Sequence, residues 1–289
     1  MKSIKTLPQD IENLFNGHEP DPQKLETFGR ELAGVVANRL RDSGARRENY
    51  LRLSNIGKPA RQVYYDIAGY GPNARWAPET LGPADKLKFL YGDIVEALFL
   101  YLAEEAGHEV TDKQKRVVVD GIVGHLDAKI DGVVTDVKSA SRFSFGKFAT
   151  GSILNGDDPF GYVLQVSGYA KAEDAPGAIW AIEKERATQV VVPVPVVDPS
   201  PKIAELKDVL GRPDPPARCY DPVPVGKSGN EGLPVGCVFC SHKRHCWADA
   251  NRGRGLRVFK YATGPTYLTT VFETPKVEEI TDTHWEEIQ

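Results

Sequence analysis

An Asp131-Gly132 pair stands between two runs rich in Val, Ile and Leu, and no other feature limits the fold of this chain as strongly. Asp-Gly is a preferred pair for a two-residue type I′ turn, so the two runs are predicted to form a β-hairpin. In that hairpin Asp127 and Asp136 face each other, although like charges directly opposite are destabilising. Lys138 shares a strand face with Asp136. The hairpin is therefore predicted to gather two carboxylates and an ammonium in one patch.

This patch has two interpretations. In the first, acids and a lysine simply alternate on a hairpin face that is exposed to solvent, and the patch has no function. The direct facing of Asp127 and Asp136 favours a second interpretation, in which a cation lies between the carboxylates. Mg²⁺ and Mn²⁺ take such hard oxygen ligands, and Lys138 could orient an attacking water or stabilise phosphate charge. The predicted chemistry is metal-dependent phosphodiester hydrolysis.

The composition is that of a globular protein with one large or two smaller domains, since the 289 residues are 41% hydrophobic and 26% charged. Residues 87–106 form the most apolar helix candidate, and their five charged side chains are incompatible with a membrane span. The N-terminus has no apolar h-region, so a cytoplasmic location is expected, in the host cytoplasm if the protein is viral. The net charge of -4 argues against a protein that coats nucleic acid.

The pattern along the chain predicts both helices and strands. Helical spacing of apolar residues predicts helices at 23–41, from about 84 onward, at 162–172 and at 204–210. Strands are predicted at 108–119, 121–130, 133–139, 178–183, 189–197, 258–261 and 267–272. The expected organisation is an N-terminal arm and helix in residues 1–50, a core in 51–210, and a cysteine region with a tail packed on the core in 211–289. Residues 1–22 are expected to be a loosely packed arm.

Two predicted helices carry polar residues that could reach the hairpin. Glu96 lies two residues from both Ile94 and Leu98, near the border of the apolar stripe. An exposed glutamate is the simpler alternative. Gln165 and Tyr169 are four residues apart, so they share one helix face.

Four motifs resemble those of the RecB-like branch of the PD-(D/E)XK nucleases, in the same order: Gly92-x-x-x-Glu96, Gly124-x-x-Asp127, Asp136-x-Lys138 and Gln165-x-x-x-Tyr169. CRISPR-associated iron-sulfur exonucleases and phage recombination exonucleases belong to that branch. The resemblance covers about residues 50–250. It implies an α/β (α+β) restriction-endonuclease-like core, in which helices flank a mixed sheet of about four or five strands.

The resemblance also implies a role for each motif residue. The implied metal ligands are Glu96, Asp127, Asp136 and the Val137 carbonyl. Lys138 becomes the catalytic lysine, and Gln165 and Tyr169 contact DNA or brace the site. Many family members have His where this chain has Glu96, and Glu is the harder donor.

The four cysteines follow the pattern Cys219-x17-Cys237-x2-Cys240-x5-Cys246. Such a cluster in a reducing compartment indicates a metal site before disulfides. The last three are similar to the C-terminal part of the family's [4Fe-4S] site, whose fourth ligand comes from an N-terminal segment. Residues 54–65 resemble that segment but contain no Cys, which leaves Cys219 as the fourth ligand. Structural Zn²⁺, with His242 or His245 able to replace a thiolate, and unliganded thiols are the alternatives.

Basic and aromatic residues near these motifs are candidate DNA contacts. The basic residues are Arg142, Lys147, Lys184, Lys243, Arg244, Arg252, Arg254 and Arg257. Phe143, Phe145 and Phe148 follow the hairpin in a predicted loop; they could stack on bases, and packing in the core is the favoured role.

The predicted function is that of a Mg²⁺- or Mn²⁺-dependent DNA exonuclease acting on single strands or duplex ends in phage recombination, replication or DNA degradation. Recombination or replication proteins are the expected partners, no membrane is expected to be one, and the oligomeric state is left open. One alternative is a structure-specific or site-specific endonuclease. An alternative of another class is a non-catalytic DNA-binding scaffold with structural zinc.

Overall fold

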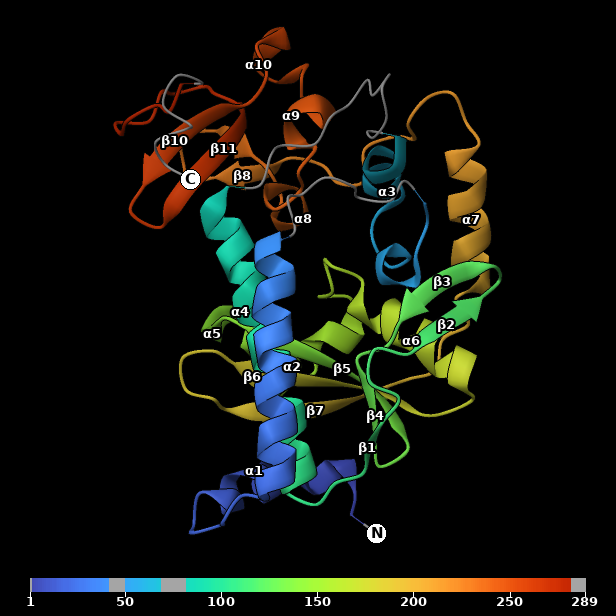
Figure 1. The fold of residues 1–289 in the computed structure, drawn as a ribbon. Helices are drawn as coiled ribbons and strands as arrows, with labels where there is room; N and C mark the ends of the chain where they lie inside the picture. The colour runs from blue at the N-terminus through green and yellow to red at the C-terminus, as the bar shows by residue number, and fades with distance from the viewer. Residues whose placement is uncertain (1, 42–49, 69–81, 282–289) are drawn as a thin grey trace. The chain divides into compact units, whose positions relative to one another are not determined.

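The computed structural model describes residues 2–41, 50–68 and 82–281, and the chain divides into two compact units (Figure 1). Unit 1 contains residues 1–57 and 85–205, and unit 2 contains residues 58–84 and 206–289. The described residues 58–68 and 82–84 therefore belong to the same unit as the cysteines. In the described part of the chain, no helix combines the length and the apolar character that a membrane span requires.

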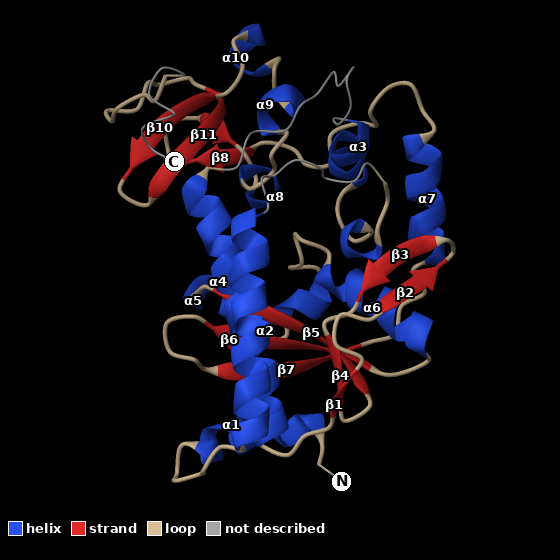
Figure 2. Ribbon diagram, in the orientation of Figure 1, coloured by secondary structure: helices blue, strands red, loops and turns tan. Residues whose placement is uncertain are grey.

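Unit 1 is built on a mixed five-stranded sheet with the strand order β1-β4-β5-β6-β7 (Figure 2). Its strands are β1 Val110–Thr111, β4 Ala128–Ile130, β5 Val133–Ala140, β6 Gly177–Glu183 and β7 Gln189–Val194. The β5–β6 pair is parallel and the other pairs are antiparallel. This sheet confirms the predicted mixed architecture.

The β4–β5 hairpin has the predicted turn and register. Asp131 and Gly132 have φ angles of 51° and 79°, and a type I′ turn requires positive φ at both positions. The pairs Ala128↔Thr135 and Ile130↔Val133 set the register. Continued by one residue, this register places Asp127 opposite Asp136, as the sequence predicted.

The strands predicted at 108–119 and 121–130 are each broken in two. β2 Arg116–Val119 and β3 Ile122–His125 form a separate hairpin beyond β1 and β4. The pairing shifts by one residue between Thr111↔Lys129 and Arg116↔His125, so the four residues 112–115 lie opposite the three residues 126–128. An extra residue of this kind is a β-bulge, which interrupts the ladder and bends the strand. Residues 111–116 read Thr-Asp-Lys-Gln-Lys-Arg, so no alternation of apolar residues supports a continuous strand there.

Helices cover both faces of the sheet. On one face, α1 Leu7–Leu14 and α4 Pro83–Glu105 share a core with Ala178, Trp180 and Ile182 of β6. On the other face, α5 Arg142–Ala149 and α6 Tyr162–Glu173 pack near Ile179 and Ala181. The alternation along β6 explains why all seven of its residues are buried. α2 Pro22–Arg41 lies beside α4 (Figure 1), where Phe28 stacks on Tyr101.

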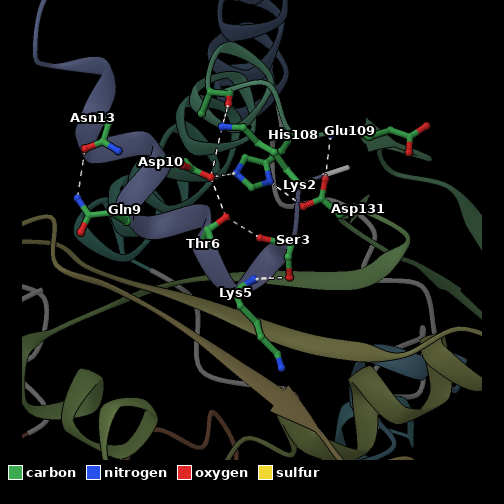
Figure 3. A network of polar contacts seen from close by, with 11 residues as sticks. Lys2, Ser3, Lys5, Thr6, Gln9, Asp10, Asn13, His108, Glu109 and Asp131 are labelled. Carbon is green, nitrogen blue, oxygen red and sulfur yellow. Dashed lines mark hydrogen bonds and ion pairs between the residues drawn. The ribbon is translucent and has the colours of Figure 1, made fainter.

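The N-terminal segment is not the loose arm predicted from its polar residues. Ile4, in the 3₁₀ turn η1 Ile4–Thr6, and Leu7 and Ile11 of α1 are buried in the unit 1 core. Polar contacts add a second link (Figure 3): Oδ2 of Asp10 lies 3.2 Å from Nε2 of the buried His108. Nδ1 of the same imidazole lies 2.7 Å from Oδ2 of Asp131 in the hairpin turn. A few apolar residues at helical spacing are therefore sufficient to pack this segment into the core.

The segment predicted as a phenylalanine-containing loop is helix α5, which Ser141 caps through a hydrogen bond from the Ser144 N–H. Phe148 is buried and Phe145 packs against the same cluster, as favoured from the sequence. Phe143 is 81% exposed. The 3₁₀ turns η2 Leu53–Asn55 and η3 Ser152–Asn155 complete unit 1.

Gly124 of β3 is the point where the second hairpin touches α6. A Cβ atom at this position would lie 2.6 Å from Cε1 of Tyr169 and 2.8 Å from Cβ of Leu53. We expect Gly124→Ala to destabilise the protein by roughly 1–3 kcal/mol through overpacking. Urea unfolding measures this, with Gly121→Asn as a control because Gly121 has open space and a φ of 76°. Equal stability of Gly124→Ala and wild type would contradict the packing argument.

Unit 2 contains a four-stranded sheet with the order β10-β11-β9-β8. Its elements are α3 Ala60–Ala68, β8 Val223–Val225, β9 Asn230–Gly232, α8 Val235–Val238, α9 Lys243–Cys246, α10 Ala250–Gly253, β10 Arg257–Tyr261 and β11 Gly264–Thr270. β10 and β11 confirm the two strands predicted near the C-terminus. α7 Ser200–Leu210 contains the boundary between the units. Leu233, Trp247 and Val258 belong to the unit 2 core.

Candidate functional site

β5 carries Asp136 and Lys138 on the face of the sheet that α6 covers. Their parallel partners in β6 are Ile179 and Ala181, which pack on that face. The Asp136 side chain is 1% exposed, and Nζ of Lys138 donates to its Oδ1 over 2.8 Å. The two-residue spacing predicted from the sequence therefore produces a direct contact.

Asp127 lies one residue before β4, at the place where β5 continues without a β4 partner. The Val137 N–H donates to Oδ2 of Asp127 over 2.8 Å. Because the N–H and C=O of one residue in an extended strand point toward the same edge, the Val137 carbonyl also faces this side of β5. Both aspartates and this carbonyl, three of the predicted ligand groups, thus lie close together.

α6 braces Asp136 from above the sheet. Nε2 of Gln165 donates to Oδ1 of Asp136 over 3.1 Å and lies 3.3 Å from the hydroxyl of Tyr169. Gln165 and Tyr169 are both buried. In this arrangement they hold the acid in place, which is one of the two roles that the resemblance implied.

Two residues that the sequence analysis missed support the same helix. Oδ1 of Asp158 accepts hydrogen bonds from the N–H groups of Gly161 and Tyr162 at the start of α6. An Asp shortly before an apolar helix is a recognisable start signal. The ring of Tyr162 lies 5.0 Å from Nζ of Lys138, and nothing in the sequence pattern indicates this contact.

α4 brings Glu96 to the other side of the acids. Oε1 of Glu96 accepts a hydrogen bond from Nε2 of Gln114 over 2.8 Å. A cavity of about 640 Å³ is lined by residues from α2, from α4 and from the bulge, and this volume is in the usual range for ligand pockets. Glu96 and Asp127 both line it, together with Glu31, Gly34, Val35, Asn38, Arg39, Asp93, Ala97, Leu100, Lys113 and Gln114.

The electrostatics of the site favour a cation. Burial and the nearby Asp136 raise the pKa of Asp127 well above its usual value. Burial also raises the pKa of Asp136, although Lys138 opposes this, and it raises the pKa of Glu96. Burial alone would lower the pKa of Lys138, but Asp136 and Asp127 outweigh it and raise that pKa. Three carboxyl groups, of which Asp136 is buried and Asp127 and Glu96 are half-buried, thus share one ammonium.

Asp136 also has an oxygen without a hydrogen bond. Its Oδ2 is buried and 2.8 Å from Nζ of Lys138, yet it makes no hydrogen bond. Buried polar atoms are ordinarily satisfied, so this oxygen fits a hard-cation ligand. Within residues 2–41, 50–68 and 82–281, no three His, Cys, Asp or Glu side chains are already grouped closely enough to hold one ion. The acids are arranged around Lys138 instead.

Unit 2 contains the four cysteines, and within the described residues no three of them are close enough to hold one ion. All of them line one cavity: Cys219, Cys237, Cys240 and Cys246. Arg61 and Gln62, at the start of α3, line the same cavity, and their backbone N–H groups lower the pKa of Cys219 against the larger effect of burial. Burial raises the pKa of Cys237 and of Cys240 to about 11. Neutral thiols are therefore expected at pH 7 unless a metal displaces their protons.

The histidines considered as zinc ligands are not among the residues described as lining this cavity. His242 is buried, with Nε2 3.1 Å from Oδ1 of Asp66 and its ring stacked on Tyr65. Arg218 is a further cavity residue that the sequence analysis missed. Its Nε donates to the Cys246 carbonyl over 2.9 Å, and its guanidinium lies 4.3 Å from the centre of the Trp247 ring.

The predicted basic residues differ in their partners and in their exposure. Lys147 pairs with Asp157 and Arg257 pairs with Glu279. Lys243 is buried, 5.2 Å from the centre of the Tyr267 ring, so its prediction as a DNA contact is wrong. Arg142, in unit 1, and Arg252 and Arg254, in unit 2, are exposed.

No protein-family model matches this chain, and no curated protein sequence matches it. Among solved structures, SSO0001 is 17% identical and the match covers 72% of this chain and 90% of that one, with a TM-score of 0.39. A phage-related exonuclease from Haemophilus somnus 129PT is 14% identical over 55% of this chain and 88% of its own, with a TM-score of 0.32. Likenesses at this level carry no argument about function.

Proposed function

We propose that the protein is a Mg²⁺- or Mn²⁺-dependent DNA exonuclease that acts in phage recombination, replication or DNA degradation. One observation carries the proposal: the carboxyl groups of Asp127, Asp136 and Glu96 interact electrostatically, and Lys138 is bonded to the buried Asp136. A fold gains no stability from crowding three acids around one lysine, since buried charges are costly unless fully paired. A cation site explains the arrangement.

The residues divide the work between binding and positioning. Asp127, Asp136, Glu96 and the Val137 carbonyl would hold the cation, which when bound polarises the phosphate and lowers the pKa of a water. Lys138 holds a proton at Nζ and offers positive charge to a phosphate oxygen. Gln165 keeps the Asp136 carboxylate oriented through its 3.1 Å hydrogen bond. The carboxylate is therefore held in position for the cation.

We infer that the four cysteines hold a [4Fe-4S] cluster, with Cys219 as the fourth ligand. Support comes from the shared cavity and from the two α3 N–H groups beside Cys219. Thiolates are the usual ligands of such clusters, and N–H groups near the sulfurs tune their properties. Structural zinc held by four thiolates is the alternative, and it would accompany a non-catalytic DNA-binding scaffold.

Cleavage assays test the nuclease proposal. With Mg²⁺ or Mn²⁺, wild-type protein is expected to shorten end-labelled linear DNA and to leave circular single-stranded DNA intact. Opening of the circle would favour an endonuclease. Lys138→Met is expected to lower the rate by at least about 100-fold, because the charge it offers contributes several kcal/mol in the transition state.

Lys171→Met is the matched control, since Lys171 lies exposed at the end of α6 and pairs with Asp198. It should cleave like the wild type. A wild type that binds Mn²⁺ but leaves every DNA substrate intact would support the scaffold alternative.

A further inference from the structure

The β-bulge at residues 112–115 has an unusual backbone. Asp112 and Gln114 have φ angles of 55° and 53°. Residues other than Gly seldom adopt this left-handed conformation, and Gln is not among those enriched in it. Such conformations persist where the surrounding structure enforces them, and they concentrate at functional sites.

Gln114 links the two acid-bearing elements of the site. Its backbone N–H donates to the Asp127 carbonyl over 3.0 Å, and its side-chain Nε2 donates to Oε1 of Glu96 over 2.8 Å. It also lines the cavity that Glu96 and Asp127 share. Gln114 thus holds the backbone of Asp127 through its own N–H and the carboxylate of Glu96 through its side-chain amide.

The bulge is also held without the Gln114 side chain. Lys113 pairs with Glu104 of α4 over 2.7 Å. Asp112 lies 3.4 Å from Lys115 and 3.5 Å from Lys129, and the Leu126 N–H donates to the Lys115 carbonyl. Shortening the Gln114 side chain should therefore leave the bulge in place.

We propose that Gln114 is a positioning residue for the cation site, and that the bulge exists to aim its carboxamide at Glu96. The proposal rests on the proposed metal-dependent function. A hydrogen bond to Oε1 restricts rotation of the Glu96 carboxylate and leaves its second oxygen for the cation. Groups that orient metal ligands in this way typically change metal affinity by about 10- to 100-fold when removed.

Two matched variants test this proposal. Gln114→Asn keeps a residue that tolerates the left-handed conformation but withdraws the amide from Glu96, whereas Asp174→Asn changes an exposed left-handed residue at the end of α6, away from the acids. We expect Gln114→Asn to weaken Mn²⁺ binding about 10-fold with little change in Tm, and Asp174→Asn to bind like the wild type. Mn²⁺ titration followed by electron paramagnetic resonance measures the affinity, and thermal unfolding measures Tm.

Gln114→Gly separates positioning from stability. Glycine removes the backbone strain and the amide together, so Tm should hold or rise while Mn²⁺ affinity falls. Wild-type affinity in both Gln114 variants, or a parallel fall in Tm and affinity, would overturn the positioning role. If the wild-type protein binds no Mn²⁺, the proposed function itself fails. If the wild-type protein binds Mn²⁺ and cleaves DNA, and Gln114→Asn binds Mn²⁺ with the same affinity, only the positioning role of Gln114 fails.

Discussion

Asp127→Asn is expected to lower metal-dependent DNA cleavage by at least about 100-fold, since the cation contributes several kcal/mol and about 1.4 kcal/mol corresponds to a factor of ten. The same change should raise the Tm of the metal-free protein. Burial and the neighbouring Asp136 make the charged form of Asp127 unfavourable, and the asparagine oxygen can still accept the hydrogen bond of the Val137 N–H. Each kcal/mol of relieved repulsion corresponds to roughly 2–4 °C.

The Tm difference should depend on pH in a defined direction. The raised pKa of Asp127 means that the folded protein keeps a proton that the unfolded chain releases near its ordinary pKa of about 3.9. Wild-type stability therefore falls as pH rises from there through the raised pKa, and the advantage of Asp127→Asn grows over that window. Asp136, Glu96 and Lys138 face the same group, so the transition is expected to be broad.

Thermal unfolding of both proteins in chelator, over a pH series that rises from the ordinary pKa of about 3.9, measures the effect. Asp157→Asn serves as the control, because Asp157 is half-exposed and pairs with Lys147 away from the acids. Activity of Asp127→Asn within tenfold of wild type would contradict the assignment of Asp127 as a metal ligand. A lower Tm in chelator would contradict the repulsion argument.

If the four cysteines hold a metal as proposed, Cys240→Ser is expected to prevent its binding and to destabilise unit 2 severely. The binding free energy of a structural metal is also folding free energy, on the order of 10 kcal/mol or more. Burial raises the pKa of the Cys240 thiol to about 11, and displacing its proton requires a metal. Without the metal, four polarisable thiols line a cavity that packing does not fill.

Iron, zinc and sulfide analysis after anaerobic purification measures the outcome. Wild-type protein should be brown and contain iron and sulfide, and Cys240→Ser should lack both. Cys219→Ser should behave in the same way if Cys219 is the fourth ligand; retention of iron would assign that ligand elsewhere. A colourless wild type with one zinc per chain would replace the iron-sulfur assignment by the structural-zinc alternative.

Local patterns predicted the hairpin most fully. The Asp-Gly turn and two-residue alternation are properties of neighbouring residues, so the type I′ turn, the register and the facing of Asp127 and Asp136 could all be predicted. The helices that carry Glu96 and Gln165 were also predicted, because apolar residues recur at helical spacing over 23 and 12 residues.

Other predictions failed where tertiary packing outweighs local preference. The polar segment at residues 1–22 contributes Leu7 and Ile11 to the core, since a few apolar residues suffice once a complementary face exists. The strand predicted at 108–119 is interrupted by the bulge, in the polar residues 111–116 where the alternation of apolar residues stops.

By itself the sequence determined that Asp127 and Asp136 face each other near Lys138, because a turn of two residues and a spacing of two along a strand fix their neighbours within a few ångströms. The tertiary structure decided which distant groups join them. Gln114 reaches Glu96, and α3 places two N–H groups beside Cys219. These contacts join segments far apart in the sequence, and burial of the cores of the two units, not local conformational preference, selects them.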